Sequence, residues 1–284
     1  MLAWYIIGSV VAALATQNLN LEKACRVNLQ LGDEVCTALG KRETANYTRE
    51  EAQVQQLVAS MAIWKTLVQS AVPALLILFF GSWSDRKSRR KPCMLLPITG
   101  EFLTAIGLIV CTYWFYELPM EVAGITEAIF PAITGGWMTM FMAVFSYIGD
   151  ITSLETRTLR IGIVNVFSSI SIPIGTAVSG VLYKKIGFYG VFSLSASIYV
   201  LSFCYGYFRI PEKRVERPPK TDSSKDFFDV GHLRDTMAVA FKQGPNNRKK
   251  RVILLMIVVM VVIGPMHGKI TFISLALKQD WRKS

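Results

Sequence analysis

The chain has 284 residues, of which 52% are hydrophobic and 18% are charged, and its mean hydropathy is +0.38. A soluble domain usually has about 25% charged residues, so this composition argues against an ordinary soluble protein. The formal charge of +11 is typical either of a nucleic-acid-binding protein or of a membrane protein with a basic cytosolic surface. With five Cys, two His and no CxxC pair, the chain offers little for a metal site or a Cys–His catalytic pair.

Six apolar blocks are long enough to cross a bilayer as helices, which takes roughly 20 residues each. A seventh apolar block, Met1–Ala15, is too short to span a membrane alone. We interpret it either as part of a first span or as a signal peptide with Ala13 and Ala15 at its cleavage site. In both cases the segment that follows lies outside the cytosol. The six long blocks are Val54–Phe80, Cys93–Tyr113, Val122–Gly149, Ile161–Leu182, Val191–Phe208 and Val252–Ala276.

The positions of the basic residues predict the orientation of these spans. With Met1–Ala15 counted as the first span, the connections after the second, fourth and sixth spans hold 19 Lys and Arg. The remaining connections and the C-terminal tail together hold 10. The positive-inside rule therefore places the first set in the cytosol. The excess of positive charge indicates orientation in a membrane, and we expect no nucleic-acid partner.

The connection after Met1–Ala15 has the features of an outer loop. It contains Asn46-Tyr47-Thr48, the only N-x-S/T sequon of the chain, so we expect glycosylation at Asn46. It also contains Cys25 and Cys36, which an oxidising compartment would allow to pair with each other or with a partner outside this chain. A glycosylated outer loop fits both the plasma membrane and an endolysosomal membrane.

A long polar segment, Arg209–Arg251, separates the sixth span from the last apolar block. Part of it has an apolar helical face, which predicts either a short helix on the cytosolic membrane surface or a disordered linker. That face is formed by Val230, Leu233, Met237 and Phe241. We divide the chain into a bundle of spans (1–208), a cytosolic linker (209–251) and a seventh span with the start of an outer loop (252–284).

Two charged segments lie on the predicted cytosolic side. The first is Gly81-Ser82-Trp83-Ser84-Asp85-Arg86-Lys87-Ser88-Arg89-Arg90, between the second and third spans. Gly81 would let a helix end approach its neighbour closely, and Asp85 could accept hydrogen bonds from a helix N-terminus and pair with an Arg. Such a cluster can hold two helical bundles together and release them; the alternative is a basic anchor without a gating role. A sparser cluster after the fourth span consists of Asp150, Arg157 and Arg160.

These segments carry a resemblance to a known family. The first resembles the G-x-x-x-D-[RK]-x-G-R-[RK] signature of the major facilitator superfamily, with Ser88 at the second Gly. Asp150-Ile-Thr-Ser153 followed by Arg157-Thr-Leu-Arg160 resembles the solute-carrier group that includes the proton-coupled folate transporter. The resemblance covers about Gln53 to Pro265. It implies an all-α membrane protein, with the N-terminal six-helix bundle and the seventh span of a twelve-span carrier that works by alternating access.

Two positions depart from the folate transporter. A Glu associated with proton coupling in its fifth span corresponds to Asn165 here, and an amide cannot carry a proton. An Asp in its fourth span corresponds to Gly136. These departures argue against proton coupling of the folate type and against folate as the solute.

The ionisable residues inside the spans are candidates for function, because a charge in hydrocarbon costs several kcal/mol by most estimates. Lys65 lies deep in its span and either faces an anionic solute or extends to the outer headgroups. Glu101 lies near the middle of its span and could pair with a cation, whereas Glu127, close to an outer end, is expected to be solvated. Lys269 is the other span cation, and His267 could change its charge near neutral pH. The candidate solute or proton site comprises Lys65, Glu101, Asn165 and His267.

Two functional hypotheses follow. The first is a secondary transporter of a small organic anion, folate-like or related, with protons as a second candidate partner. The second is a truncated, non-transporting membrane protein that modulates such a carrier. We expect no enzyme, cofactor or metal, because no loop combines a nucleophile with a base, a metal-ligand set or a phosphate-binding Gly-rich sequence.

Overall fold

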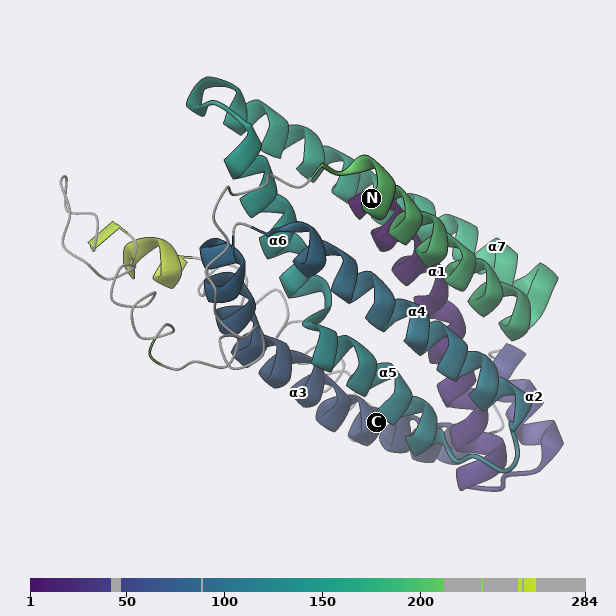
Figure 1. The fold of residues 1–284 in the computed structure, drawn as a ribbon. Coiled ribbons are helices and arrows are strands. Elements are labelled where there is room, and N and C mark those ends of the chain that lie inside the picture. Colours follow the sequence, from purple (N-terminus) through teal and green to yellow (C-terminus); the bar gives the residue numbers. More distant parts are fainter. Residues whose placement is uncertain (42–46, 88, 212–230, 232–249, 252, 259–284) are drawn as a thin grey trace. The chain divides into compact units, whose positions relative to one another are not determined.

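The computed structural model of the chain describes residues 1–41, 47–87, 89–211, 231, 250–251 and 253–258. The described residues form helices and their connections, without a strand among them, so the predicted all-α fold is confirmed (Figure 1). The chain divides into two compact units, Met1–Phe227 and Phe228–Ser284, and every element named below belongs to the first. These elements are α1 (Leu2–Lys23), the π-helix η1 (Ala24–Asn28), α2 (Asp33–Lys41), α3 (Thr48–Lys87), α4 (Lys91–Tyr113), α5 (Met120–Thr134), α6 (Gly136–Ile151) and α7 (Leu154–Arg209).

The first helix is longer than the sequence predicts. Met1–Ala15 lies in a longer helical segment, because α1 continues into η1 and the two form a candidate span of 27 residues, which agrees with the interpretation of the block as part of a first span. The polar residues beyond Ala15 remain helical because they find partners in the bundle. The ammonium group of Lys23, which is fully buried, donates hydrogen bonds to the carbonyl oxygens of Phe115 and Leu118, each at 2.8 Å.

The later spans agree with the prediction apart from their lengths. The blocks that begin at Val54, Cys93 and Val122 correspond to α3, α4 and the pair α5–α6. The blocks Ile161–Leu182 and Val191–Phe208 are the two halves of α7, whose 56 residues would otherwise be far longer than a bilayer is thick. The block Val252–Ala276 falls largely outside the described residues.

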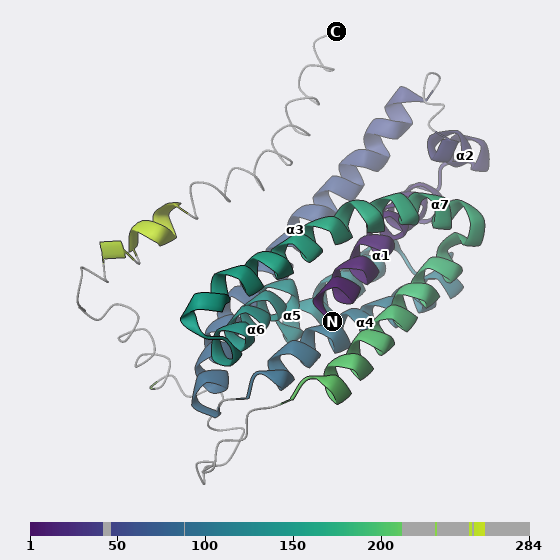
Figure 2. The same ribbon diagram turned by 90° about the horizontal axis from the view of Figure 1, so that it is seen from above.

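A single glycine divides α7 into two antiparallel halves. Gly187 has φ 63° and ψ −168°, a conformation that breaks the helix and that residues with a side chain rarely adopt. The chain turns back at this point, and α1 packs against both halves (Figure 2). On one side of α1, the Ser179 hydroxyl donates to the carbonyl of Val11 at 2.8 Å. On the other side, a Cβ at Gly8 would lie 3.0 Å from the ring of Tyr199, so this contact requires a small residue.

Two adjacent glycines break the fourth span into α5 and α6. Gly135 has φ 81° and ends α5 in the left-handed conformation, and Gly136 has φ 52°. A Cβ at Gly135 would lie 2.1 Å from the hydroxyl oxygen of Thr139. The break therefore depends on glycine both for its backbone conformation and for space.

A disulfide joins η1 to α2 within the first loop, and hydrogen bonds connect this loop to the start of α5. Cys25 and Cys36 form a disulfide. Asn28 donates to both carboxylate oxygens of Glu121, at 2.9 and 2.8 Å, and its own amide oxygen accepts a hydrogen bond at 3.0 Å from the backbone N–H of Met120. The segment between α1 and α2 is thus attached to the N-terminus of α5.

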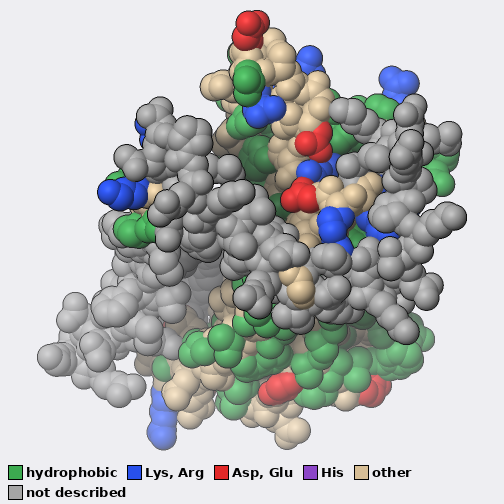
Figure 3. Space-filling model, turned by 60° about the vertical axis from the view of Figure 1, so that its left-hand side comes forward, with side chains coloured by type: hydrophobic (Ala, Val, Ile, Leu, Met, Phe, Trp, Pro, Cys, Tyr) green, Lys and Arg blue, Asp and Glu red, His purple; other side chains and the backbone are tan. Residues whose placement is uncertain are grey.

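Large apolar side chains are exposed along α3 and the first half of α7. On α3, Ile63, Leu67 and Leu75 are 64–69% exposed. One face of the molecule carries a broad area of hydrophobic side chains, with charged side chains above it and a few at its lower edge (Figure 3). Such surfaces are unfavourable in water and are typical of helices that contact lipid or another helical bundle.

Candidate functional site

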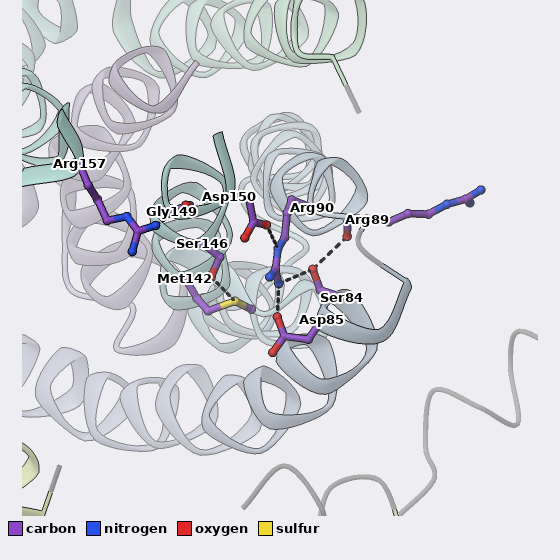
Figure 4. Close-up of polar contacts among 9 residues, drawn as sticks. All are labelled: Ser84, Asp85, Arg89, Arg90, Met142, Ser146, Gly149, Asp150 and Arg157. Carbon is purple, nitrogen blue, oxygen red and sulfur yellow. Dashed lines mark hydrogen bonds and ion pairs between the residues drawn. The ribbon is translucent and has the colours of Figure 1, made fainter. Parts of the chain in front are cut away.

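Arg90 is the centre of a polar cluster at the ends of three helices. Its Nη1 atom lies 2.5 Å from Oδ1 of Asp85 on α3, and its Nε atom lies 2.9 Å from Oδ2 of Asp150 on α6 (Figure 4). Nη1 also donates to the hydroxyl of Ser84 at 3.0 Å. Because Arg90 is itself the N-cap residue of α4, one guanidinium group joins α3, α4 and α6.

The pKa of Arg90 reflects its position between the two carboxylates. Partial burial favours the neutral form and lowers the pKa, but the hydrogen bonds and negative charges of Asp150 and Asp85 outweigh burial and raise it. The side chain is 13% exposed. Arg90 therefore remains protonated at every physiological pH and acts as a permanent cation in this cluster.

Arg89 takes part in the cluster through its backbone alone. The side chain of Arg89 points away from it, and only the backbone carbonyl of Arg89 takes part, by accepting a hydrogen bond from Ser84 at 3.0 Å (Figure 4). Arg86 is half-buried. Of the candidate gating residues, the structure thus brings Asp85, Arg90 and Asp150 together.

The three residues of the predicted second cluster, Asp150, Arg157 and Arg160, do not pair with one another in the structure. Asp150 pairs with Arg90 rather than with its sequence neighbours. Arg157 lies one turn into α7 and donates from Nη2 to the carbonyl of Gly149 at 2.8 Å, which satisfies a backbone group near the C-terminus of α6. Arg160 is exposed. The sequence places these residues near one another, but only the packing of α4 against α6 selects the partner of Asp150.

The role predicted for Gly81 is not supported by the structure. A Cβ built on Gly81 meets no atom within 4 Å among the described residues, so no close approach there requires a glycine. Gly81 is a helical residue of α3 in this structure.

Lys65 and Glu127 form an ion pair between α3 and α5. The Nζ atom of Lys65 lies 2.6 Å from Oε1 of Glu127, and the two side chains are 17% and 21% exposed. Asn20 on α1 donates to Oε2 of the same carboxylate at 3.3 Å. Gln69, one turn beyond Lys65, donates to the backbone carbonyl of Glu127 at 2.9 Å. Glu127 is thus bound by groups from two other helices.

A cavity of about 150 Å³ lies beside this pair. Its polar lining includes Glu127, Glu101 and the side chain of Gln69, and further polar groups come from Thr16 and Thr104. The cavity is bounded by α1, α3, α4, α5 and the second half of α7. The remaining lining residues are Ser9, Ala12, Ala13, Ala105, Leu108, Pro131 and Tyr199.

Glu101 lies near the midpoint of α4, on the wall of this cavity. The Tyr5 hydroxyl donates to Oε1 of Glu101 at 3.4 Å. Tyr5 packs against Tyr199, with ring centroids 6.2 Å apart, and the hydroxyl of Tyr199 has no hydrogen-bond partner in the described part of the chain. Two carboxylates therefore line one cavity, in different surroundings: a cation binds Glu127, whereas phenols lie near Glu101.

The structure gives Glu127 and Lys65 surroundings that differ from those predicted. Glu127 was expected to be solvated at the membrane surface, and this is wrong, because Lys65 and Asn20 bind it beside the cavity. The ammonium group of Lys65 is bound by Glu127 and does not extend to the headgroups, and its contact with a solute stays a prediction. Asn20 was not predicted as a partner of Glu127, because it lies beyond Ala15, where the predicted first span ends.

The other candidate residues either lie away from this cavity or fall outside the residues that the structure describes. Asn165 is exposed on the first half of α7. His267 and Asn46 fall outside the described residues. Tyr5 and Tyr199, which the sequence analysis did not single out, belong to the site; an aromatic residue in an apolar block gives no signal that distinguishes it from ordinary packing.

The chain matches a family model and curated proteins. The model described as Major Facilitator Superfamily matches residues 1–280. The chain is 26% identical over 211 residues to the probable peptidoglycan muropeptide transporter SLC46 of Drosophila melanogaster, covering 71% of this chain and 40% of that protein. It is 23% identical over 169 residues to the proton-coupled folate transporter of Bos taurus, covering 60% of this chain and 35% of that protein.

These matches confirm the resemblance that the charged segments carried, both to the superfamily and to the solute-carrier group. The chain spans about 40% of the length of the Drosophila relative and 35% of the bovine one. Five described helical segments are long and apolar enough to cross a membrane. Together with the family match, they identify a multi-pass membrane protein.

Proposed function

Because the chain belongs to the Major Facilitator Superfamily, we propose that it supplies the first bundle of a secondary transporter that moves a small organic solute by alternating access. The observation that carries this proposal is the position of Arg90 between Asp85 and Asp150. Three helix ends on the predicted cytosolic side are joined by one fixed cation. A cluster of this kind holds the ends of these three helices together, so that this side of the bundle can move as a unit.

We infer that the solute carries a carboxylate and binds near Lys65. The names of the two relatives specify muropeptide and folate, and both kinds of molecule carry carboxylates. In the structure Glu127 neutralises Lys65. A solute carboxylate that replaces Glu127 on Lys65 exchanges one ion pair for another, so binding does not leave a bare cation in the membrane.

Uptake measurements test this proposal in the complete carrier that contains this chain. Cells that express it are expected to accumulate labelled folic acid or a labelled muropeptide, and Lys65→Ala is expected to lower that uptake by about tenfold or more. Surface expression of each variant is measured in the same cells. Lack of uptake of both probes by the wild type would contradict transport of these classes, and unchanged uptake by Lys65→Ala would remove Lys65 from the site.

A second candidate function is a non-transporting membrane protein that modulates such a carrier. Sequencing the transcript across its 3′ end separates the two functions. A reading frame that continues for five more spans supports the carrier, and a stop codon after Ser284 supports the modulator.

A further inference from the structure

We propose that Glu101 binds and releases a proton inside the bundle, and that this residue supplies the proton coupling of the carrier. The coupling part of this inference rests on the transport function proposed above, whereas proton binding by Glu101 does not. The site consists of the Glu101 carboxyl group, the hydroxyls of Tyr5 and Tyr199, and the cavity that Glu101 and Tyr199 line.

The position of Glu101 makes a permanent negative charge unfavourable. It lies near the midpoint of α4, a span of 23 residues, and is half-buried. Among the described residues, no Lys, Arg or His forms an ion pair with it, whereas Lys65 does so with Glu127. An unpaired carboxylate at this depth is strongly unfavourable, so binding of a proton is the simplest way to remove the charge.

The neighbours of Glu101 can stabilise both of its protonation states. A phenol hydroxyl is a donor and an acceptor. Tyr5 donates to the ionised carboxylate, as in the structure, and could accept from the protonated acid after rotation of its hydroxyl. Lysine, the partner of Glu127, has only donors and supports only the ionised form. The two acids of the cavity are therefore chemically different, and only Glu101 has neighbours suited to changing its charge.

Tyr199 supplies an independent indication that a ligand or proton acceptor belongs in this cavity. Its side chain lines the cavity and is 1% exposed, and its hydroxyl lies near Ser9 of the same cavity without making a hydrogen bond of normal geometry to any group in the described part of the chain. A buried hydroxyl without a partner is costly. A hydrogen bond with Glu101 or with a bound water, formed when the protonation state changes, would satisfy it.

The groups that face Glu101 come from all the helices that pack around the cavity. Tyr5 comes from α1, Tyr199 from the second half of α7, and Glu127 from α5. Lys65 on α3 is directed at Glu127 and neutralises it. No free charge besides Glu101 remains among these residues, so a proton taken up in this cavity is assigned to Glu101.

This assignment differs from the position expected by resemblance. The position of the coupling Glu of the folate transporter is occupied here by Asn165, an exposed amide on the first half of α7. Glu101 lies on α4, against α1 and the second half of α7. A carrier with an amide instead of an acid at Asn165 would thus hold its proton at Glu101.

The first experiment requires no solute. The complete carrier is purified and reconstituted in lipid, and infrared difference spectra are recorded between acidic and neutral pH. We expect the band of a protonated carboxyl group that disappears in Glu101→Gln and persists in Glu127→Gln. Absence of the band in the wild type, its persistence in Glu101→Gln, or its loss in Glu127→Gln would overturn the assignment.

A second pair of variants tests the phenol neighbours while leaving the acid in place. Tyr199→Phe keeps the ring and removes the hydroxyl, so we expect the midpoint of the infrared transition to shift. Tyr183→Phe removes a hydroxyl of α7 that lies 3.5 Å from Glu22, and it is expected to leave the midpoint unchanged. Equal midpoints in Tyr199→Phe and the wild type would contradict the role of Tyr199.

Transport measurements then separate the coupling from the transport itself. In proteoliposomes, Glu101→Gln is expected to lower uptake of labelled folic acid or muropeptide driven by a pH gradient by about tenfold or more, while solute exchange at equal pH persists. Unchanged gradient-driven uptake, or equal loss of both modes, would overturn the coupling role. If the wild type moves neither probe, the transport proposal fails, and the infrared result still decides whether Glu101 holds a proton.

Discussion

Lys65 on α3 donates a hydrogen bond of 2.6 Å to Glu127 on α5, a residue 62 positions away in the chain. Each residue alone would carry an unfavourable charge into the span, and together they are neutral. The pair also distinguishes the two acids of the cavity, because it leaves Glu101 as the acid without a cation. The proposed site for a solute carboxylate, near Lys65, and the proposed proton site, Glu101, therefore both depend on this one ion pair.

Replacement of Lys65 by Met should destabilise the bundle. It removes the cation and leaves the partly buried Glu127 without its main partner, which we expect to cost about 1–3 kcal/mol. Thermal unfolding of the purified carrier in detergent measures this loss. The double variant Lys65→Met/Glu127→Gln removes both charges and is expected to recover most of the stability. A double variant as unstable as Lys65→Met would contradict the pairing.

Replacement of Arg90 by Lys should impair transport although the charge is kept. The guanidinium group contacts Asp85, Asp150 and Ser84 at once, and an ammonium group cannot reproduce that fork. We expect uptake to fall by about tenfold. Arg89→Lys is the matched control, because the side chain of Arg89 points away from the cluster; an equal loss in both variants would show that basic charge alone matters.

The stability that Arg90 contributes should not depend on pH in the neutral to alkaline range. Asp150 and Asp85 raise its pKa against the opposing effect of burial. For a base with a raised pKa, the contribution is complete below the pKa of the unfolded chain and is lost only as the pH rises through the folded value. The difference in melting temperature between the wild type and Arg90→Ala should therefore be equal at about pH 7 and about pH 9. A smaller difference at the higher pH would contradict the assignment.

Substitution of Gly135 by Ala should damage the break between α5 and α6. The φ angle of 81° is unfavourable for a residue with a side chain, and the new Cβ would overlap the hydroxyl of Thr139. We expect a loss of about 1–3 kcal/mol in the free energy of unfolding. Gly162→Ala is the control, since its Cβ meets nothing within 4 Å and its backbone is helical; it should be neutral or slightly stabilising.

Removal of the disulfide between Cys25 and Cys36 should loosen the outer loop. The bond closes a segment with a sequence separation of 11, for which the stabilisation is about 2–3 kcal/mol. Cys25→Ser/Cys36→Ser is expected to lower the melting temperature under non-reducing conditions, whereas Cys204→Ser, which replaces an exposed free cysteine, should not. Peptide mapping that finds Cys25 linked to another cysteine would disprove this pairing.

Much of the architecture follows from the sequence because it depends on local properties. Apolar blocks of about 20 residues must become helices in a bilayer, since no other segment satisfies its own backbone there. α3 and α4 therefore lie where their blocks predict. The spacing from Gly81 to Arg90 was also sufficient to indicate the superfamily, because that resemblance rests on residues adjacent in the chain.

The partners of the charges depend instead on which helices pack together, and this is where the tertiary structure decides. Asp150 lies seven residues from Arg157 but binds Arg90, because α6 packs against α4. Polar residues beyond Ala15 appear to end the first span, yet α1 continues because Lys23 and Asn20 find acceptors on other segments. The sequence by itself determined the spans, the family and the list of charged residues. Only the packing determined that Lys65 neutralises Glu127 and that Glu101 remains among phenols, because these contacts join helices whose neighbours no local pattern specifies.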